Sequence, residues 1–427
     1  MKIRSITGGA VALTASILLA GCAGTSSDTP DDGSVSGTLT GIFDSTYREG
    51  MDEIIALFEE EYPDVTVEMD YQGGDLQALI GTMLQSGTAP DIVLSQPGGP
   101  TSGVDINVVT QGAQGRYMDL SDLEWTADIP EMWLEGQLAY EGKVYGYPGA
   151  VQPLSPIYNL DLLEELGLGA PTTYEEVLQL CADAQANGVY AYAQGLGDVT
   201  GGGPQMLSYA QMATLLYGPE PDFREQLDSG ATTYQDSPWV DQFKIYEEMN
   251  EAGCFGEGAL GRSRQQGSEA VAAGQALGQV DVGGQKAVMQ EIAPDTRFLI
   301  TGMPATEDAA DTFITALPGY TVSVNAEAEN PTAARAFMDF LATPEAGVIY
   351  AGMFSAVPIL PNDQYEAPED LADFAALVES GGIALLAQIG GNSVQQVLNE
   401  QVQAMILGDA TPVDVAERMQ EAFDAVE

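Results

Sequence analysis

The chain has 427 residues, with 64 Asp and Glu against 13 Lys and Arg, no His, and a formal net charge of −51 at pH 7. A negative field of this size repels nucleic acid, so we expect no nucleic-acid partner. The missing histidine removes the usual general base, the Ser-His and Cys-His nucleophile pairs and the commonest metal ligand, so we expect no metal and no cofactor.

The N-terminus has the features of a secretory signal over residues 1–21. Two basic residues precede an apolar run from Ile6 to Leu19, which is too short to span a bilayer of about 30 Å. The tetrapeptide LAGC that ends at Cys22 has the form of a lipobox, in which the cysteine sulfur becomes the attachment point for diacylglycerol. Residues 22–37 are small, polar and acidic, as expected of the lipidated cysteine and a flexible tether. We therefore expect a body held at the outer face of the cytoplasmic membrane by lipid alone.

Strands and helices alternate after the tether. In the segment Met51–Phe58, the apolar residues lie at positions i, i+3, i+4 and i+7, which form one face of a helix. The predicted order is strand Thr38–Phe43, helix Met51–Phe58, strand Val65–Met69, helix Leu76–Met83 and strand Ile92–Leu94. This alternation predicts a doubly wound α/β sheet, whose ligands bind at the carboxyl ends of the strands. About 390 residues follow the tether, which implies two or more domains.

Helix signals recur towards the C-terminus. Asn330-Pro331 predicts a helix start, with proline at the first helical position. Apolar residues between Val394 and Met405 predict another helix, and Thr411-Pro412 predicts the start of the last one.

Two cysteines remain once Cys22 is lipidated. Cys181 and Cys254 would both lie in an oxidising compartment, where an even pair favours a disulfide. Two unpaired buried thiols are the alternative, because the sequence does not give their separation.

The segment 140–176 carries a resemblance to a known family. It reads YEGKVYGYPGAVQPLSPIYNLDLLEELGLGAPTTYEE and resembles the family 1 extracellular solute-binding proteins, including their maltose-binding members. Further stretches of this resemblance follow the family's order along the mature chain, namely 89–93, 270–278, 319–324, 334–341 and 407–412.

The resemblance implies a two-lobed, periplasmic-binding-protein-like α/β fold of type II. Each lobe would be a doubly wound sheet with flanking helices, and crossing strands would form the hinge. The first crossing is expected at 146–151, the second near 298–303 and the third after Leu341. The expected lobes are 38–147 plus 298–343, and 148–297 plus 344–427.

The resemblance also implies a function without catalysis. The chain would be a monomeric receptor of an ABC importer that captures a mono- or oligosaccharide by hinge closure. The closed form would dock on a permease pair driven by an ATPase.

The candidate ligand contacts follow from matched positions. Asp44 follows the first strand, where the maltose-binding relatives place an acidic sugar contact, and Gln152 occupies the position of a cleft carboxylate. Ser95 and Gln96 follow the third predicted strand and so lie at its carboxyl end. The complete set is Asp44, Tyr47, Gln72, Ser95, Gln96, Gln152, Asp198, Tyr209, Gly283 and Tyr320.

The tryptophans depart from the family pattern. Sugar-binding relatives stack pyranose faces on cleft tryptophans, but here Ser95, Gly283 and Gln395 stand at the matching places. This favours a saccharide other than maltodextrin, or a smaller polyol-like ligand, with tyrosines as the aromatic wall. Trp133 is expected in the core. The wall tyrosines would be Tyr47, Tyr209 and Tyr320.

Three alternatives remain open. A surface glycoside hydrolase needs only two carboxylates flanking the bond and no histidine. The acidic composition would also suit a receptor for a polyamine or another non-sugar solute. A ferric-ion receptor uses paired tyrosines, and the chain contains no adjacent Tyr-Tyr.

Overall fold

The computed structural model describes residues 34–74, 76–98, 106–134, 136–199, 202–386 and 392–425. The predicted signal, the lipidation site Cys22 and the tether as far as residue 33 lie outside these ranges. In the described ranges, every helix is too short or too polar to cross a lipid bilayer.

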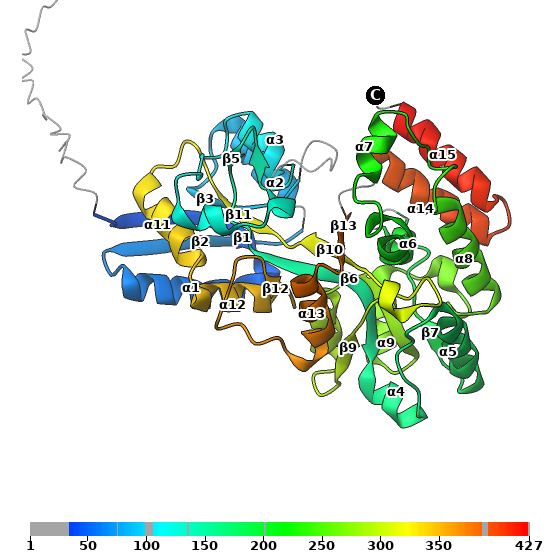
Figure 1. The fold of residues 1–427 in the computed structure, drawn as a ribbon. Coiled ribbons are helices and arrows are strands. Elements are labelled where there is room, and N and C mark those ends of the chain that lie inside the picture. Colours follow the sequence, from blue (N-terminus) through cyan, green and yellow to red (C-terminus); the bar gives the residue numbers. More distant parts are fainter. Residues whose placement is uncertain are drawn as a thin grey trace, which may run out of the picture. The chain divides into compact units, whose positions relative to one another are not determined.

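The elements alternate along the chain much as the hydrophobic pattern predicts (Figure 1). The strands are β1 Gly37–Asp44, β2 Val65–Gln72, β3 Ile92–Ser95, β4 Ala139–Tyr140, β5 Lys143–Val144, β6 Ala150–Asn159, β7 Tyr190–Tyr192, β8 Ala276–Val282, β9 Phe298–Ile300, β10 Ile314–Pro318, β11 Thr321–Val324, β12 Val357–Pro358 and β13 Ile383–Leu385. The α-helices are α1 Arg48–Glu61, α2 Leu76–Ser86, α3 Val108–Ala113, α4 Leu160–Leu166, α5 Tyr174–Ala186, α6 Gly203–Met212, α7 Phe223–Asp228, α8 Trp239–Glu251, α9 Arg264–Ala272, α10 Gln285–Ile292, α11 Pro331–Leu341, α12 Pro344–Met353, α13 Ala372–Ser380, α14 Asn392–Ile406 and α15 Pro412–Asp424.

The first sheet has four strands in the order β11-β3-β1-β2. β1 pairs in parallel with β2 and β3, whereas β11 runs antiparallel to β3. Helix α1 buries the predicted apolar face, from Met51 to Phe58. The predicted strand–helix–strand alternation is therefore confirmed, and the carboxyl ends of β1, β2 and β3 meet at one edge of this sheet.

The second sheet has seven strands, in which β13-β10-β6-β8-β7 form the main path and β9 and β12 also pair with β6. β7 is parallel to β8, and β10 is parallel to β13, while β6 runs antiparallel to both β8 and β10. The amino end of β6 therefore lies at the same edge as the carboxyl ends of β7, β8 and β10.

Two short segments link the edges of the two sheets. The chain passes from β10 to β11 through Gly319 and Tyr320, and Gly319 N donates to Ala150 O at 2.9 Å. It enters β6 through residues 146–149, and Tyr147 N donates to Val322 O at 2.9 Å. The expected second passage near residue 298 falls on β9, which pairs with β6 within the second sheet.

Buried apolar side chains form two clusters. One is built around β1, β3, α1 and α11, and the other joins β7 and β8 to helices α5, α6, α8, α14 and α15. Trp133 is 3% exposed, which confirms its predicted place in the core. The predicted helix starts are confirmed as well, since Asn330 caps α11 and Thr411 forms a capping box with Asp414 on α15.

A disulfide joins Cys181 on α5 to Cys254 in the loop after α8, with their Cα atoms 4.7 Å apart. Both cysteines are fully buried. The bond closes a chain segment that spans 73 positions of the sequence. It therefore ties α5 to the loop that follows α8.

Candidate functional site

The carboxyl edge of the first sheet collects four of the predicted ligand residues. Asp44 ends β1 and lies opposite Gln72, the last residue of β2. Ser95 ends β3, and Gln96 follows it. This convergence follows from parallel pairing, because parallel strands place their carboxyl ends together.

Asp44 is half-buried and already has a structural role. Its Oδ1 accepts a hydrogen bond of 2.8 Å from Thr46 N and so caps the short 3₁₀ helix Ser45–Tyr47. A carboxylate has further acceptor capacity, so Asp44 can receive ligand hydroxyls while it caps this turn.

Tyr47 and Tyr320 form an aromatic wall together with Phe354. The ring centroids of Tyr47 and Phe354 are 4.3 Å apart, and Tyr320 lies 6.3 Å from Tyr47 and 6.4 Å from Phe354. Tyr47 and Tyr320 are half-buried, whereas Phe354 is 1% exposed. Phe354 therefore supports the two tyrosine rings from beneath.

The hydroxyl groups of this wall stay neutral at physiological pH. Burial raises the pKa of Tyr47 above its ordinary value of 10.0, and the charges of Tyr320 and Asp44 raise it further. Burial also raises the pKa of Tyr320, against a hydrogen bond of 2.9 Å that its hydroxyl oxygen accepts from Gln77 Nε2. Both phenols can therefore donate to ligand oxygens.

The side chains of Ser95 and Gln96 differ in their hydrogen bonds within the protein. Ser95 is fully buried, and its hydroxyl lies 2.7 Å from the Ser323 hydroxyl across the β3–β11 pair. Gln96 is half-buried, and its Oε1 accepts no hydrogen bond from the described residues. A buried amide oxygen of this kind is expected to have a partner, which a ligand hydroxyl can supply.

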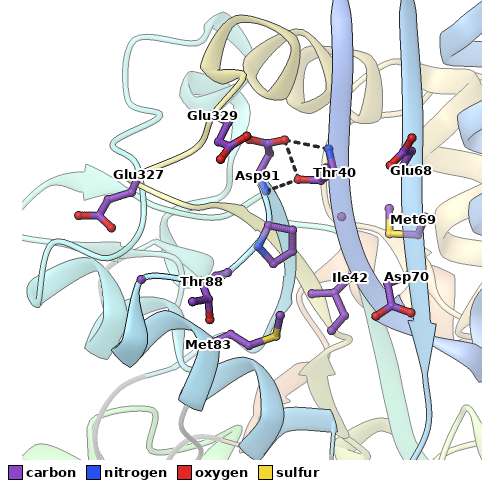
Figure 2. Close-up of a pocket in the computed structure, with 14 residues that line it drawn as sticks. Thr40, Ile42, Glu68, Met69, Asp70, Met83, Thr88, Asp91, Glu327 and Glu329 are labelled. Atoms are coloured by element: carbon purple, nitrogen blue, oxygen red, sulfur yellow. Dashed lines mark hydrogen bonds between the residues drawn. The ribbon is translucent and has the colours of Figure 1, made fainter. Parts of the chain in front are cut away.

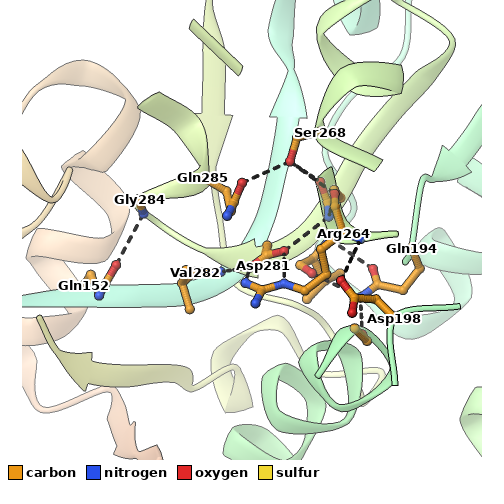
Figure 3. A network of polar contacts seen from close by, with 12 residues as sticks. Gln152, Gln194, Asp198, Arg264, Ser268, Asp281, Val282, Gly284 and Gln285 are labelled. Carbon is orange, nitrogen blue, oxygen red and sulfur yellow. Dashed lines mark hydrogen bonds and ion pairs between the residues drawn. The ribbon is translucent and has the colours of Figure 1, made fainter. Parts of the chain in front are cut away.

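The corresponding edge of the second sheet holds Gln152 and Asp198 (Figure 3), and Gly283 directly follows β8 there. Gln152 Oε1 accepts from Gly284 N at 3.3 Å, just after the end of β8. Asp198 Oδ2 accepts from Arg264 N at 3.3 Å, at the start of α9. Gln152 thus comes from the amino end of β6, and its partner Gly284 follows the carboxyl end of β8.

Gly283 leaves little room for the tryptophan of sugar-binding relatives. A Cβ atom at this position would lie 3.0 Å from Pro153 Cδ and 3.2 Å from Ser355 O. Both distances are shorter than ordinary van der Waals contact. The Pro153 ring and the Ser355 carbonyl would therefore have to shift to admit a larger side chain here.

Tyr209 lies apart from the aromatic wall. It is 2% exposed in the second core, on α6, and its backbone carbonyl accepts from Thr315 Oγ1 at 2.6 Å. Of the three tyrosines expected to form a wall, the structure brings Tyr47 and Tyr320 together.

Three residues of these edges were missed by the sequence analysis, namely Gln77, Arg264 and Phe354. Phe354 follows α12 and meets Tyr47 through tertiary packing alone, and Gln77 reaches Tyr320 from α2. The scarcity of positive charge could have pointed to Arg264, because the chain contains only 13 Lys and Arg.

A cavity of about 670 Å³ lies elsewhere on the first sheet (Figure 2). Thr40, Ile42, Met69 and Met83 line it together with Glu327 and other exposed carboxylates. Asp91, which is buried there, is fully engaged, as it accepts from Thr40 N, Thr40 Oγ1 and Asn330 N. None of the predicted ligand residues lines this cavity, so we distinguish it from the candidate site.

Replacing Asp44 with asparagine is expected to weaken binding of the ligand about tenfold, because an amide oxygen accepts less strongly than a carboxylate. Asparagine can still accept from Thr46 N, so the turn and the folded state should be preserved. Isothermal titration calorimetry measures the affinity, and urea unfolding provides the control. Wild-type affinity in Asp44→Asn would remove this carboxylate from the ligand contacts.

The protein has two β-sheets covered by helices, with chain segments that cross between them and polar residues at the linked edges. These features define a two-lobed binding fold. The sequence matches the family described as "Bacterial extracellular solute-binding protein" over residues 44–348. The chain therefore belongs to this family of extracellular solute-binding proteins.

Curated relatives are similar over part of the chain. A maltooligosaccharide ABC transporter solute-binding lipoprotein of Streptococcus pneumoniae serotype 4 is 28% identical over 207 residues, which is 47% of this chain and 43% of that protein. The melibiose/raffinose/stachyose-binding protein of Bacillus subtilis strain 168 is 22% identical over 303 residues, or 70% of this chain and 67% of that protein. The chain thus spans less than half the length of the pneumococcal relative.

A solved structure shares the fold more completely. The solute-binding protein RafE in complex with raffinose has a TM-score of 0.73 and 20% identity, over 91% of this chain and 99% of that chain. The unliganded form of RafE from Streptococcus pneumoniae also has a TM-score of 0.73, with 18% identity over 92% of this chain and 98% of that chain.

Proposed function

We propose that this protein is the extracytoplasmic receptor of an ABC importer and that it captures an oligosaccharide between the carboxyl edges of its two sheets. The observation that carries the proposal is the direct passage from β10 to β11 through Tyr320, which joins both edges at the aromatic wall. Saccharides suit such a site, because aromatic rings cover their apolar faces while amides and carboxylates bind their hydroxyls.

Raffinose-type oligosaccharides are the ligand class that we favour. The names of the relatives include raffinose, stachyose and melibiose besides maltooligosaccharide. Gly283 supplies no aromatic platform, and the wall that remains consists of the half-buried rings of Tyr47 and Tyr320. A site with a tyrosine wall differs from the tryptophan stacking that we expect for maltodextrin.

Capture would proceed by closure about the linking segments. The first lobe would contain residues 38–147 and the later segment that begins at β11, because β9 and β10 pair within the second sheet. A ligand that contacts both edges binds the closed form more tightly and thereby shifts the equilibrium towards it. The closed form would then dock on the permease pair, with the protein attached to the outer face of the membrane through lipid on Cys22.

Calorimetry of the mature body with melibiose, raffinose, stachyose, maltotriose and spermidine tests the proposal. We expect micromolar or tighter binding of raffinose or stachyose, weaker binding of maltotriose and no heat with spermidine. Small-angle scattering with and without the bound saccharide should show a more compact particle. Binding of spermidine alone would favour the polyamine alternative, and cleavage of the saccharides above a blank would favour a glycoside hydrolase.

A further inference from the structure

Arg264 lies at the carboxyl edge of the second sheet and is the first residue of α9 (Figure 3). Its Nε donates to Asp281 Oδ2 at 3.0 Å, and its Nη2 donates to Asp281 Oδ1. Asp281 is the penultimate residue of β8, next to the Gly283-Gly284 turn that Gln152 contacts. The ion pair therefore lies among the candidate ligand residues of this edge.

The orientation of Arg264 is fixed from several sides. Its backbone carbonyl accepts from Gln279 Nε2 at 3.0 Å, and its backbone N–H donates to Asp198. A Cβ at Gly195 would lie 2.6 Å from Arg264 N, so the backbone of the loop after β7 packs directly against the arginine. The guanidinium is therefore presented in one arrangement, with little freedom left to lose when it binds a ligand.

Stability is a weak explanation for this ion pair. Asp281 is fully buried and also accepts from Val282 N at 2.7 Å and Gln279 Nε2 at 3.2 Å. Removing two charges from water is costly, and apolar residues of similar volume usually stabilise a fold at least as well. Asp281 accepts from four N–H donors and holds Arg264 in place. A binding role of Arg264 explains this arrangement better than stability does.

The Arg264 side chain is 23% exposed, whereas the Asp281 side chain is 0% exposed. A guanidinium has five N–H donors and no acceptor, so it can bind Asp281 and ligand oxygens together. Its planar fork suits two neighbouring hydroxyl oxygens of a sugar ring. The ammonium groups of a polyamine are also only donors, so they cannot form hydrogen bonds with the guanidinium.

We propose that Arg264 is a ligand-binding and specificity-determining residue, which donates hydrogen bonds to adjacent oxygens of the captured saccharide while Asp281 holds its guanidinium in position. The inference rests on the proposed receptor function. It adds a cationic donor to a site otherwise composed of tyrosines, amides and carboxylates, and it selects saccharides over polyamines.

Arginine labelling of the wild-type body tests the contact without altering the fold. Phenylglyoxal modification is followed by mass spectrometry with and without raffinose, at a concentration that calorimetry shows to be saturating. We expect at least fivefold slower labelling of Arg264 in the presence of raffinose. Arg297 is the control, because it is 55% exposed and pairs with Asp161 and Glu164 away from these edges. Equal labelling of Arg264 with and without bound raffinose would overturn the inference.

The variant Arg264→Lys separates a ligand contact from shielding by lobe closure. Lysine keeps the charge beside Asp281 but lacks the fork, so we expect at least tenfold weaker raffinose binding with a urea midpoint close to wild type. Arg297→Lys should bind as wild type. Wild-type affinity in Arg264→Lys contradicts the inference and leaves the receptor function intact. Absence of heat with every saccharide in the wild type contradicts the receptor function itself.

Discussion

Replacing Cys181 and Cys254 together with alanine is expected to lower the free energy of unfolding by about 4 kcal/mol. The disulfide closes a segment of 73 positions, and the chain entropy that the unfolded state gains when such a loop is opened stabilises it by about this amount. For a body of this length the melting temperature should fall by roughly 5 °C. Urea unfolding under oxidising conditions measures the difference.

Two controls accompany the cysteine variant. Wild-type protein in dithiothreitol should lose a similar amount of stability, whereas the double variant should not respond to reductant. Its saccharide affinity should match wild type, because both cysteines are buried in the helical layer and contribute nothing to the two edges. A loss of stability below about 1 kcal/mol would show that the unfolded chain gains little freedom when this bond is absent.

The double variant Tyr47→Leu/Tyr320→Leu is expected to bind raffinose roughly 100-fold more weakly than wild type. Each substitution keeps an apolar side chain against Phe354 but removes the aromatic plane and the phenol hydroxyl. Loss of about 1–1.5 kcal/mol per ring gives this factor. Titration calorimetry measures the affinity.

Tyr140→Leu is the matched control for the tyrosine pair. Tyr140 lies on the two-residue strand β4, is 37% exposed and is not one of the candidate ligand residues. This variant should bind raffinose as wild type does, and all variants should show the same circular dichroism. Unchanged affinity in the Tyr47/Tyr320 variant would mean that the aromatic wall does not contact the sugar.

The buried face of α1 and the strand ends of the first sheet were predictable from local patterns. Apolar periodicity depends only on residues a few positions apart, so Met51 to Phe58 identify a helix and its buried face directly. Because parallel strands align their carboxyl ends, Asp44 and Gln72 could be placed at one edge before their register was known.

The sequence by itself thus determined the alternating α/β order, the helix starts at Asn330 and Thr411, and the edge that carries Asp44. Only the tertiary structure decided that Phe354 supports Tyr47, that Ser95 bonds to Ser323, and that Asp281 holds Arg264. These contacts depend on sheet order and on packing between distant segments, which no local spacing encodes. Local periodicity therefore predicts which residues lie at an edge of a sheet, whereas the tertiary structure decides which residues they contact.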